Sequence, residues 1–209
     1  MKTLKLRYVL CRFISIVLLF CQLGNSAYAA KLKTIDLDNY SVSMADAAIM
    51  THFNSNGLLL SRALYSHAIV SNRDVFYGSG DYDTFMPIPD GIVSGIKENG
   101  KFQQCLKNVK DKARTNKKAT EKKSYSINLN NTDDLKYSLA NANVTIDVDY
   151  LKDSNSYNIW ITVTDKYDFH WKECDFMDWA CYGNNLSYVK QQLNQLNNFK
   201  VSVCFSYSE

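Results

Sequence analysis

The sequence lacks the signatures of several common enzyme and metal-binding classes. It has no glycine-rich phosphate loop, no Gly-x-Ser-x-Gly turn that would present a nucleophilic serine, and no His-Glu-x-x-His helix. It has no Cys-x-x-Cys pair, and His52, His67 and His170 do not have the spacing of metal ligands. These absences disfavour nucleotide-dependent enzymes, serine hydrolases and zinc proteases. They predict no metal site and indicate no particular cofactor.

The apolar run near the start of the chain is too short to cross a bilayer. Phe13–Cys21 has about half of the roughly 20 residues that a transmembrane helix needs. Four basic residues precede it (Lys2, Lys5, Arg7 and Arg12), and Ala27-Tyr28-Ala29 follows it with the small-x-small pattern of a signal-peptidase site. A lipoprotein site at Cys21 is the weaker alternative, because bulky Phe20 precedes it. We therefore predict a signal peptide over residues 1–29 and a periplasmic or secreted protein without a transmembrane anchor.

The charges nearly balance once the predicted signal peptide is set aside. The chain has 24 Lys and Arg and 21 Asp and Glu, and the first 29 residues hold four of the basic residues and none of the acidic ones. The remaining 20 basic and 21 acidic residues do not predict nucleic-acid binding.

Positive charge is concentrated between residues 101 and 123, where nine basic residues accompany only Asp111 and Glu121. No aromatic residue lies between Phe102 and Tyr125, which disfavours stacking on a single-stranded nucleic acid. One interpretation is a solvated helix end and linker. The other is contact with an anionic envelope component, either lipid headgroups or a phosphate-rich polymer.

Four cysteines remain after residue 29: Cys105, Cys174, Cys181 and Cys204. An even number in an exported chain predicts disulfide bonds, and four cysteines allow three pairings. We favour Cys174–Cys181, which closes a short local loop, together with Cys105–Cys204, which ties a helical region to the final strand.

The pattern of apolar residues predicts an α+β fold in a single domain over residues 30–209. Helical periodicity dominates from about residue 41 to residue 118, and residues 77–83 are predicted as a loop. Strand alternation dominates from about residue 124 to residue 209, in the order β-α-β-β-α-β. The expected architecture is a helical first half followed by a small antiparallel sheet stapled by the disulfides, with residues 199–205 as an edge or partner strand.

The densest group of reactive side chains follows the most regular predicted strand, in residues 165–171. If the strand continues, Asp165, Tyr167 and Phe169 share one face, while Asp168 and His170 share the other. A carboxylate beside an imidazole fixes the tautomer and raises the basicity of the ring, as a general base requires. The alternative is structural: an aspartate at a strand end caps a turn, and aromatic rings fill the core.

Three segments carry a resemblance to known proteins: Thr162–Phe169, Met50–Gly57 and Leu193–Val201. They resemble small secreted bacterial domains with an Asp-x-Tyr-Asp-Phe strand end, related to the C-terminal modules of polymorphic and contact-dependent toxins. The resemblance implies an exported protein of the interbacterial-competition type.

Asp165, Tyr167 and Asp168 also resemble the active-site strand of colicin M-like bacteriocins, phosphodiesterases that cleave the lipid-linked peptidoglycan precursor. This resemblance implies catalytic roles for the three residues. The family pattern continues with a His-Arg pair that starts six residues after the second aspartate, where this chain has Cys174-Asp175. The nearest imidazole here is His170. The departure removes the general acid/base and the phosphate-binding cation of the family site.

Aromatic residues gather in and beside the predicted Cys174–Cys181 loop: Trp171, Phe176, Trp179 and Tyr182. A stapled loop leaves such side chains little room to fold inward, and aromatic residues dominate the hot spots of protein interfaces. They are candidates for binding a protein partner, with coverage of the sheet as the alternative.

Two functions of different classes follow from these patterns. The favoured one is a non-catalytic binding protein of immunity or adaptor type, which uses the aromatic loop and the basic helix. The alternative is a colicin M-like hydrolase. The missing His-Arg pair favours binding, and a precursor hydrolase exported by a plain signal peptide would also attack the cell that produces it.

Overall fold

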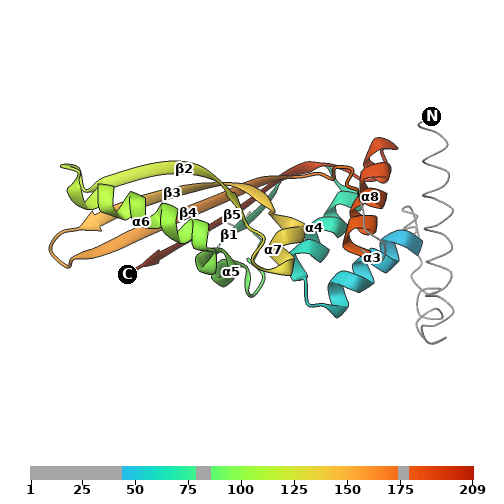
Figure 1. Ribbon diagram of the computed structural model, residues 1–209, viewed down its shortest axis with the longest axis horizontal. Helices are drawn as coiled ribbons and strands as arrows, with labels where there is room; N and C mark the ends of the chain where they lie inside the picture. The colour runs from blue at the N-terminus through green and yellow to red at the C-terminus, as the bar shows by residue number, and fades with distance from the viewer. Residues whose placement is uncertain (1–43, 79–85, 174–178) are drawn as a thin grey trace.

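The computed structural model describes residues 44–78, 86–173 and 179–209. These residues form an α+β fold with six helices and five strands (Figure 1). The helices are α3 (Met44–Ser55), α4 (Leu59–Val70), α5 (Ile92–Glu98), α6 (Gly100–Thr115), α7 (Asp133–Ser138) and α8 (Trp179–Gln192). The strands are β1 (Val75–Gly78), β2 (Thr120–Asn128), β3 (Asn141–Leu151), β4 (Ser156–Tyr167) and β5 (Phe199–Ser208). The predicted signal peptide and its cleavage site lie outside the described residues.

The strands form one mixed sheet in the order β1-β5-β4-β3-β2. Strands β2 to β5 pair antiparallel, as predicted, but β1 pairs parallel to β5. The expected α+β fold is therefore confirmed, but the sheet is mixed where an antiparallel one was expected, and one of its strands lies in the half expected to be helical. Strand β1 was missed because only Val75 and Tyr77 alternate in its four residues, which is too short a pattern to recognise. Its pairing also places β5 inside the sheet instead of at the edge.

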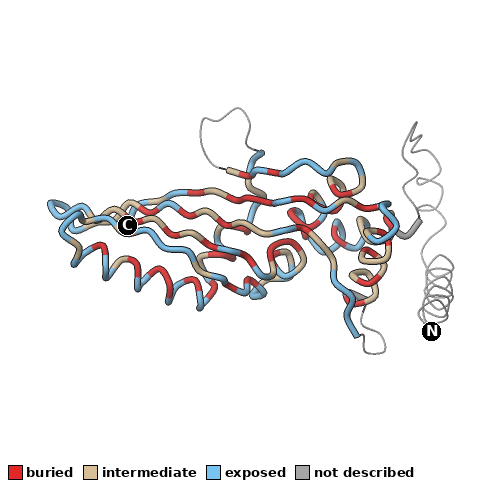
Figure 2. Tube along the Cα trace, turned by 90° about the horizontal axis from the view of Figure 1, so that it is seen from above, coloured by how far each residue is buried: buried red, intermediate tan, exposed pale blue. Residues whose placement is uncertain are grey.

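The two faces of the sheet differ completely. Buried apolar residues alternate along β3 and β4, and Val144 pairs with Val163 and Ile146 with Ile161 on the face that α5 and α6 cover (Figures 1 and 2). We call this the covered face. The residues between them point to the opposite, open face, which is largely polar and carries Trp160 as an exposed aromatic residue. This one-sided burial is typical of antiparallel sheets.

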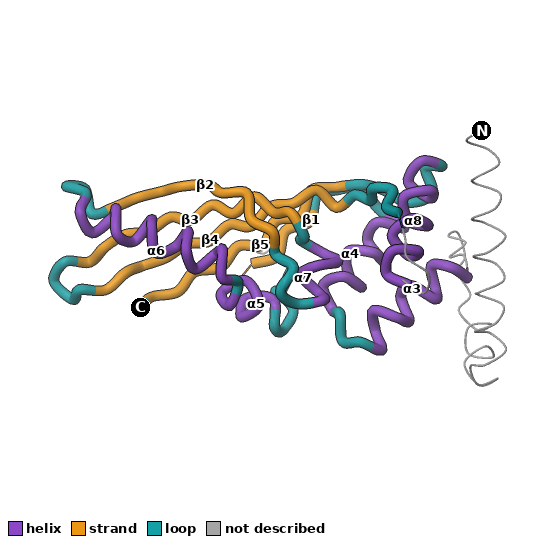
Figure 3. The backbone as a smooth tube through the Cα atoms, in the orientation of Figure 1, coloured by secondary structure: helices purple, strands orange, loops and turns teal. Residues whose placement is uncertain are grey.

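The helices fall into two groups (Figure 3). Helix α6 lies along the sheet and packs on β2 and β3 through Phe102, Cys105, Leu106, Val109 and Ala113. Helices α3, α4 and α8 gather at one end of the sheet. This separation leaves the outer side of α6 in solvent along most of its length. Figure 2 shows this as an alternation of buried and exposed residues along the helix.

Local polar contacts explain where several helices begin and end. The side chain of Asn99 accepts hydrogen bonds from the backbone N–H groups of Lys101 and Phe102 and so caps α6. Helix α4 has no cap of its own, and the carboxylate of Asp134 in α7 accepts from the N–H groups of Leu60 and Ser61 instead. Asn99 therefore ends α5 and also starts α6.

The predicted Cys105–Cys204 disulfide is wrong, because both cysteines are free. Cys105 lies on the buried side of α6, which packs on the covered face, and burial raises the pKa of its thiol. Cys204 pairs with Thr162 in the sheet and lies on the open face, since its neighbours Val203 and Phe205 point into the core. The sheet therefore separates the two thiols. Cys181 is disulfide-bonded, but its expected partner Cys174 lies outside the described residues, so the Cys174–Cys181 pairing stays a prediction.

Candidate functional site

Tyr167, the central residue of the predicted site, belongs to the core. It is the last residue of β4, pairs with Phe199, and is 4% exposed. Its ring centroid lies 5.2 Å from those of Phe169 and Phe199. Burial raises the pKa of Tyr167 above its ordinary value. The hydroxyl has no hydrogen-bond partner among the described residues. Tyr167 therefore fills the core and does not present its hydroxyl to a substrate.

Asp165 is held by the backbone around it. Its Oδ1 accepts a hydrogen bond of 2.8 Å from the N–H of Lys166, and the N–H of Asn141 also donates to the carboxylate. Burial nevertheless raises the pKa of Asp165 above its usual range, because desolvation outweighs these two bonds. The contacts match the structural interpretation, in which an aspartate at a strand end binds backbone amides.

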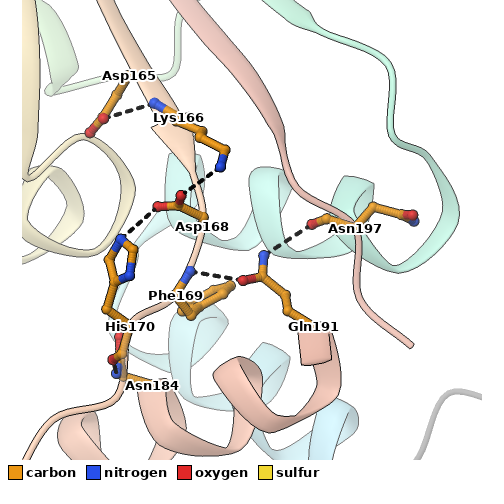
Figure 4. Close-up of polar contacts among 8 residues, drawn as sticks. All are labelled: Asp165, Lys166, Asp168, Phe169, His170, Asn184, Gln191 and Asn197. Atoms are coloured by element: carbon orange, nitrogen blue, oxygen red, sulfur yellow. Dashed lines mark hydrogen bonds and ion pairs between the residues drawn. The ribbon is translucent and has the colours of Figure 1, made fainter. Parts of the chain in front are cut away.

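Asp168 and His170 do meet, as Figure 4 shows. The Oδ1 of Asp168 lies 3.3 Å from the Nε2 of His170, and its Oδ2 lies 3.0 Å from the Nζ of Lys166. The side chain of Asp168 is 20% exposed and that of His170 is 79% exposed. We call Lys166, Asp168 and His170 the strand-end cluster. Asp168 can orient the imidazole, but the ring stands in water, and the nearby lysine already pairs with the aspartate.

Helix α8 fixes the segment that carries this cluster, through residues that sequence reasoning missed. The side-chain oxygen of Gln191 accepts from the N–H of Phe169 at 2.9 Å, and the side-chain N–H of Asn184 donates to the carbonyl of His170 at 2.6 Å (Figure 4). Asn185 accepts from the N–H of Lys172 and donates to its carbonyl. These side-chain amides bond the backbone N–H and C=O groups of residues 169–172, which have left the sheet and pair with none of the described strands. The only sequence signal was the run of amide residues in α8.

Of the predicted catalytic residues, the structure brings together Asp168 and His170 alone. Asp165 and Tyr167 share the covered side of the strand, as the alternation predicted, and neither makes a hydrogen bond to this pair in the part of the chain that the structure describes. The four residues therefore do not converge on one substrate. The geometry matches a structural role for Asp165 and Tyr167.

The predicted aromatic surface is described only in part. Trp171 is 47% exposed and its ring lies edge-on to that of Tyr188 at 6.2 Å. Tyr182 is half-buried on α8. Phe176 lies outside the described residues, and so does the side chain of Trp179, whose backbone begins α8. Trp171 is the member of the set that the structure places at the surface.

A second polar cluster, absent from the sequence-based prediction, lies between the helices. Asp46 of α3 accepts a 2.8 Å hydrogen bond from the hydroxyl of Tyr65 in α4 and forms an ion pair with Lys190 of α8. All three residues are buried. We call them the interhelical cluster. Burial and the nearby carboxylate of Asp46 raise the pKa of Tyr65 above its ordinary value. The cluster is closed to solvent and ties three helices together.

The basic segment places most of its cations in solvent. Helix α6, the turn after it and the start of the edge strand β2 carry eight exposed basic residues: Lys101, Lys107, Lys112, Arg114, Lys117, Lys118, Lys122 and Lys123. We call these the basic surface. Within the described residues only two of the eight form ion pairs, Lys107 with Asp111 and Lys122 with Asp147. Six exposed cations therefore lack an acidic partner there.

No metal site or membrane span is found in the described parts. Within residues 44–78, 86–173 and 179–209, no three His, Cys, Asp or Glu side chains gather where they could hold a metal ion. None of the helices described is both long and apolar enough to cross a bilayer.

Comparisons with known proteins found no relative of this chain. No family model, no curated protein and no solved structure matches the chain.

Proposed function

We propose that this chain is an exported, non-catalytic binding protein of the bacterial envelope whose basic surface docks on anionic lipid headgroups. The observation that carries the proposal is the basic surface itself, with six exposed cations outside any ion pair in the described chain. The predicted signal peptide supports export. The separate surroundings of Asp165, Tyr167 and Asp168 support binding over catalysis.

The electrostatics favour a lipid surface because the cations are arranged over an extended area. They lie on α6, on the turn after it and on the edge strand β2, which Figure 1 shows beside the helix, so several of them can approach one surface together. Each lysine or arginine near an anionic membrane contributes about 1 kcal/mol. Exposed charges of this kind are strongly screened by salt, so the attraction should fall as ionic strength rises.

Vesicle sedimentation tests this docking. We expect the protein to bind vesicles that contain phosphatidylglycerol and not vesicles of phosphatidylcholine alone. Neutralising Lys112, Arg114 and Lys117 with glutamine should weaken binding roughly a hundredfold, since three charges near the surface are lost. The matched control changes Arg73, Lys136 and Lys152 to glutamine, which removes the same charge from exposed positions elsewhere.

Two outcomes would contradict the docking proposal. One is equal binding to neutral and anionic vesicles. The other is an equal loss of binding in both triple variants, which would show dependence on net charge and not on the basic surface.

Export has its own test: the protein recovered from the periplasm should begin at Ala30, and an intact Met1 would contradict cleavage.

The resemblance to toxin-related secreted domains gives this binding protein an immunity or adaptor role in interbacterial competition. Trp171 supports a protein contact, because it presents an aromatic ring at the surface beside Tyr188. The basic surface and Trp171 come from different elements, α6 and the segment before α8. The protein therefore has separate regions with which to contact a membrane and a partner.

One observation favours a second candidate function, the colicin M-like hydrolase. Asp168 contacts His170 at 3.3 Å, which is the carboxylate–imidazole arrangement of a general base. The test is hydrolysis of the lipid-linked peptidoglycan precursor by the wild type and by His170→Ala. Cleavage that His170→Ala abolishes would support the hydrolase and contradict the non-catalytic proposal.

A further inference from the structure

The open face of the sheet contains a hollow near the ends of β3, β4 and β5. It has a volume of about 410 Å³, within the range of about 300–1,000 Å³ typical of small-molecule sites. Its lining residues are Asn141, Asn143, Thr164, Asp165, Lys166 and Lys200. Strand alternation places five of them on the open face, since Ala142, Val163 and Val201 between them point into the core.

The register brings two like charges together at this hollow. Lys166 of β4 and Lys200 of β5 are direct cross-strand partners. Like charges directly opposite each other on one face destabilise a sheet unless something neutralises them. Asp168 pairs with Lys166 at 3.0 Å. Lys200 makes no ion pair within the described residues.

Unused hydrogen-bond donors lie on β3, which β4 separates from Lys200. The side-chain amides of Asn141 and Asn143 make no hydrogen bond in the described part of the chain. The acid of the lining, Asp165, directs its carboxylate to the backbone N–H groups of Lys166 and Asn141, which compensate its charge. The lining therefore carries two lysines and one carboxylate, with Lys200 outside any ion pair among the described residues, and it offers unused amide donors.

We propose that this hollow binds a small ligand through an oxyanion group, either a carboxylate or a phosphate. Lys200 supplies the principal charge, and Lys166 supplies a second that Asp168 shares. Asn141 and Asn143 donate hydrogen bonds to the oxyanion or to hydroxyl groups beside it. Charge-assisted hydrogen bonds of this kind are stronger than neutral ones. The proposal does not depend on the lipid docking of α6, because α6 and the hollow lie on opposite faces of the sheet.

Nuclear magnetic resonance titration of the full protein tests the site with three matched sugars. Glucose 6-phosphate and glucuronate carry the two oxyanions, and glucose carries neither. We expect at least one of the two anions to shift the amide signals of Asn143, Thr164 and Lys200 saturably, and glucose to leave them in place. The response to the two anions identifies whether phosphate or carboxylate is the preferred group.

Two variants with equal charge locate the binding. Lys200→Gln should weaken binding of the preferred sugar about tenfold, the effect of losing one charge-assisted contact. Lys152→Gln, in the turn after β3, removes the same charge far from the hollow and should leave the affinity unchanged. The proposal would be overturned by equal shifts with glucose, by affinity that Lys200→Gln does not change, or by shifts confined to the basic surface.

Discussion

The strand-end cluster and the interhelical cluster contain the same kinds of groups in opposite surroundings. Each has a carboxylate bonded to a lysine and to a ring-bearing side chain: Asp168 at the end of β4 and Asp46 between the helices. Water surrounds the first, where Lys166 and His170 are mostly exposed, whereas Asp46 and Tyr65 are almost fully buried. Burial strengthens electrostatic contacts and makes their loss costly.

The difference shows that residues close together in the sequence need not make the contacts that contribute most to stability. Lys166, Asp168 and His170 are neighbours along the chain, and their segment holds the densest group of reactive side chains in the sequence. Asp46 and Lys190 are separated by 144 residues and meet only because α3 and α8 pack at the same end of the sheet. We expect the interhelical cluster to control stability and the strand-end cluster to affect it little.

Replacing Lys190 by methionine should give the largest effect. The change leaves the carboxylate of Asp46 buried without its cation, and breaking a buried ion pair in this way costs about 3–5 kcal/mol. Lys166→Met is the matched control, since it breaks a pair whose lysine is largely exposed and which contributes about 1 kcal/mol. Urea unfolding followed by circular dichroism measures both. Equal losses in the two variants would remove the distinction between the clusters.

Alkaline pH should weaken the fold through its buried tyrosines. Folding raises the pKa of Tyr65 and Tyr167, while an unfolded tyrosine loses its proton near pH 10. The folded state then retains protons that the unfolded state releases, so stability falls as pH rises above about 10, by about 1.4 kcal/mol per pH unit for each tyrosine. Urea unfolding between about pH 9 and 11 checks this. A free energy that stays level over that range would contradict it.

Tyr167→Phe and Tyr65→Phe should have opposite effects at neutral pH. The hydroxyl of Tyr167 has no partner in the described chain, so its removal should leave the free energy of unfolding unchanged or raise it by up to about 1 kcal/mol. Removing the hydroxyl of Tyr65 loses its bond to Asp46 and should lower stability by about 1–3 kcal/mol. Thermal and urea unfolding compare the two. Marked destabilisation by Tyr167→Phe would show that its hydroxyl has a structural partner.

Strand alternation in the sequence predicted the sheet region well, because burial on one face imposes a strict period of two. The pattern placed Val144, Ile146, Ile161 and Val163 on one face, and the register confirms it. The same alternation also contained the information that overturns the Cys105–Cys204 disulfide, because Cys204 sits between Val203 and Phe205. The even number of cysteines favoured the disulfide, whereas the alternation places Cys204 on the face opposite to Cys105.

The remaining features depend on contacts that no local pattern encodes. The parallel pairing of β1 with β5 joins segments more than a hundred residues apart, and so does the ion pair of Asp46 with Lys190. The cap that Asp134 provides for α4 comes from another helix. The hollow arises where three strands end together. Sequence reasoning found the chemistry of residues 165–170 but could not determine which of them pack inward.

Asp168→Asn should have the smallest effect on stability and separates the remaining interpretations of the strand end. Among the described residues, Asp168 accepts no backbone hydrogen bond that would make it a cap; its partners there are the side chains of Lys166 and His170, both largely exposed. Exposed ion pairs contribute about 0–1 kcal/mol, so asparagine, which keeps the shape, should change the free energy of unfolding by less than about 1 kcal/mol. Thermal unfolding measures this, and lipid binding by the basic surface should be unchanged in the same variant. A loss of stability well above that range would mean that the cluster helps to hold the strand end in place. Full stability combined with loss of precursor cleavage would instead assign Asp168 to catalysis and favour the hydrolase over the binding protein.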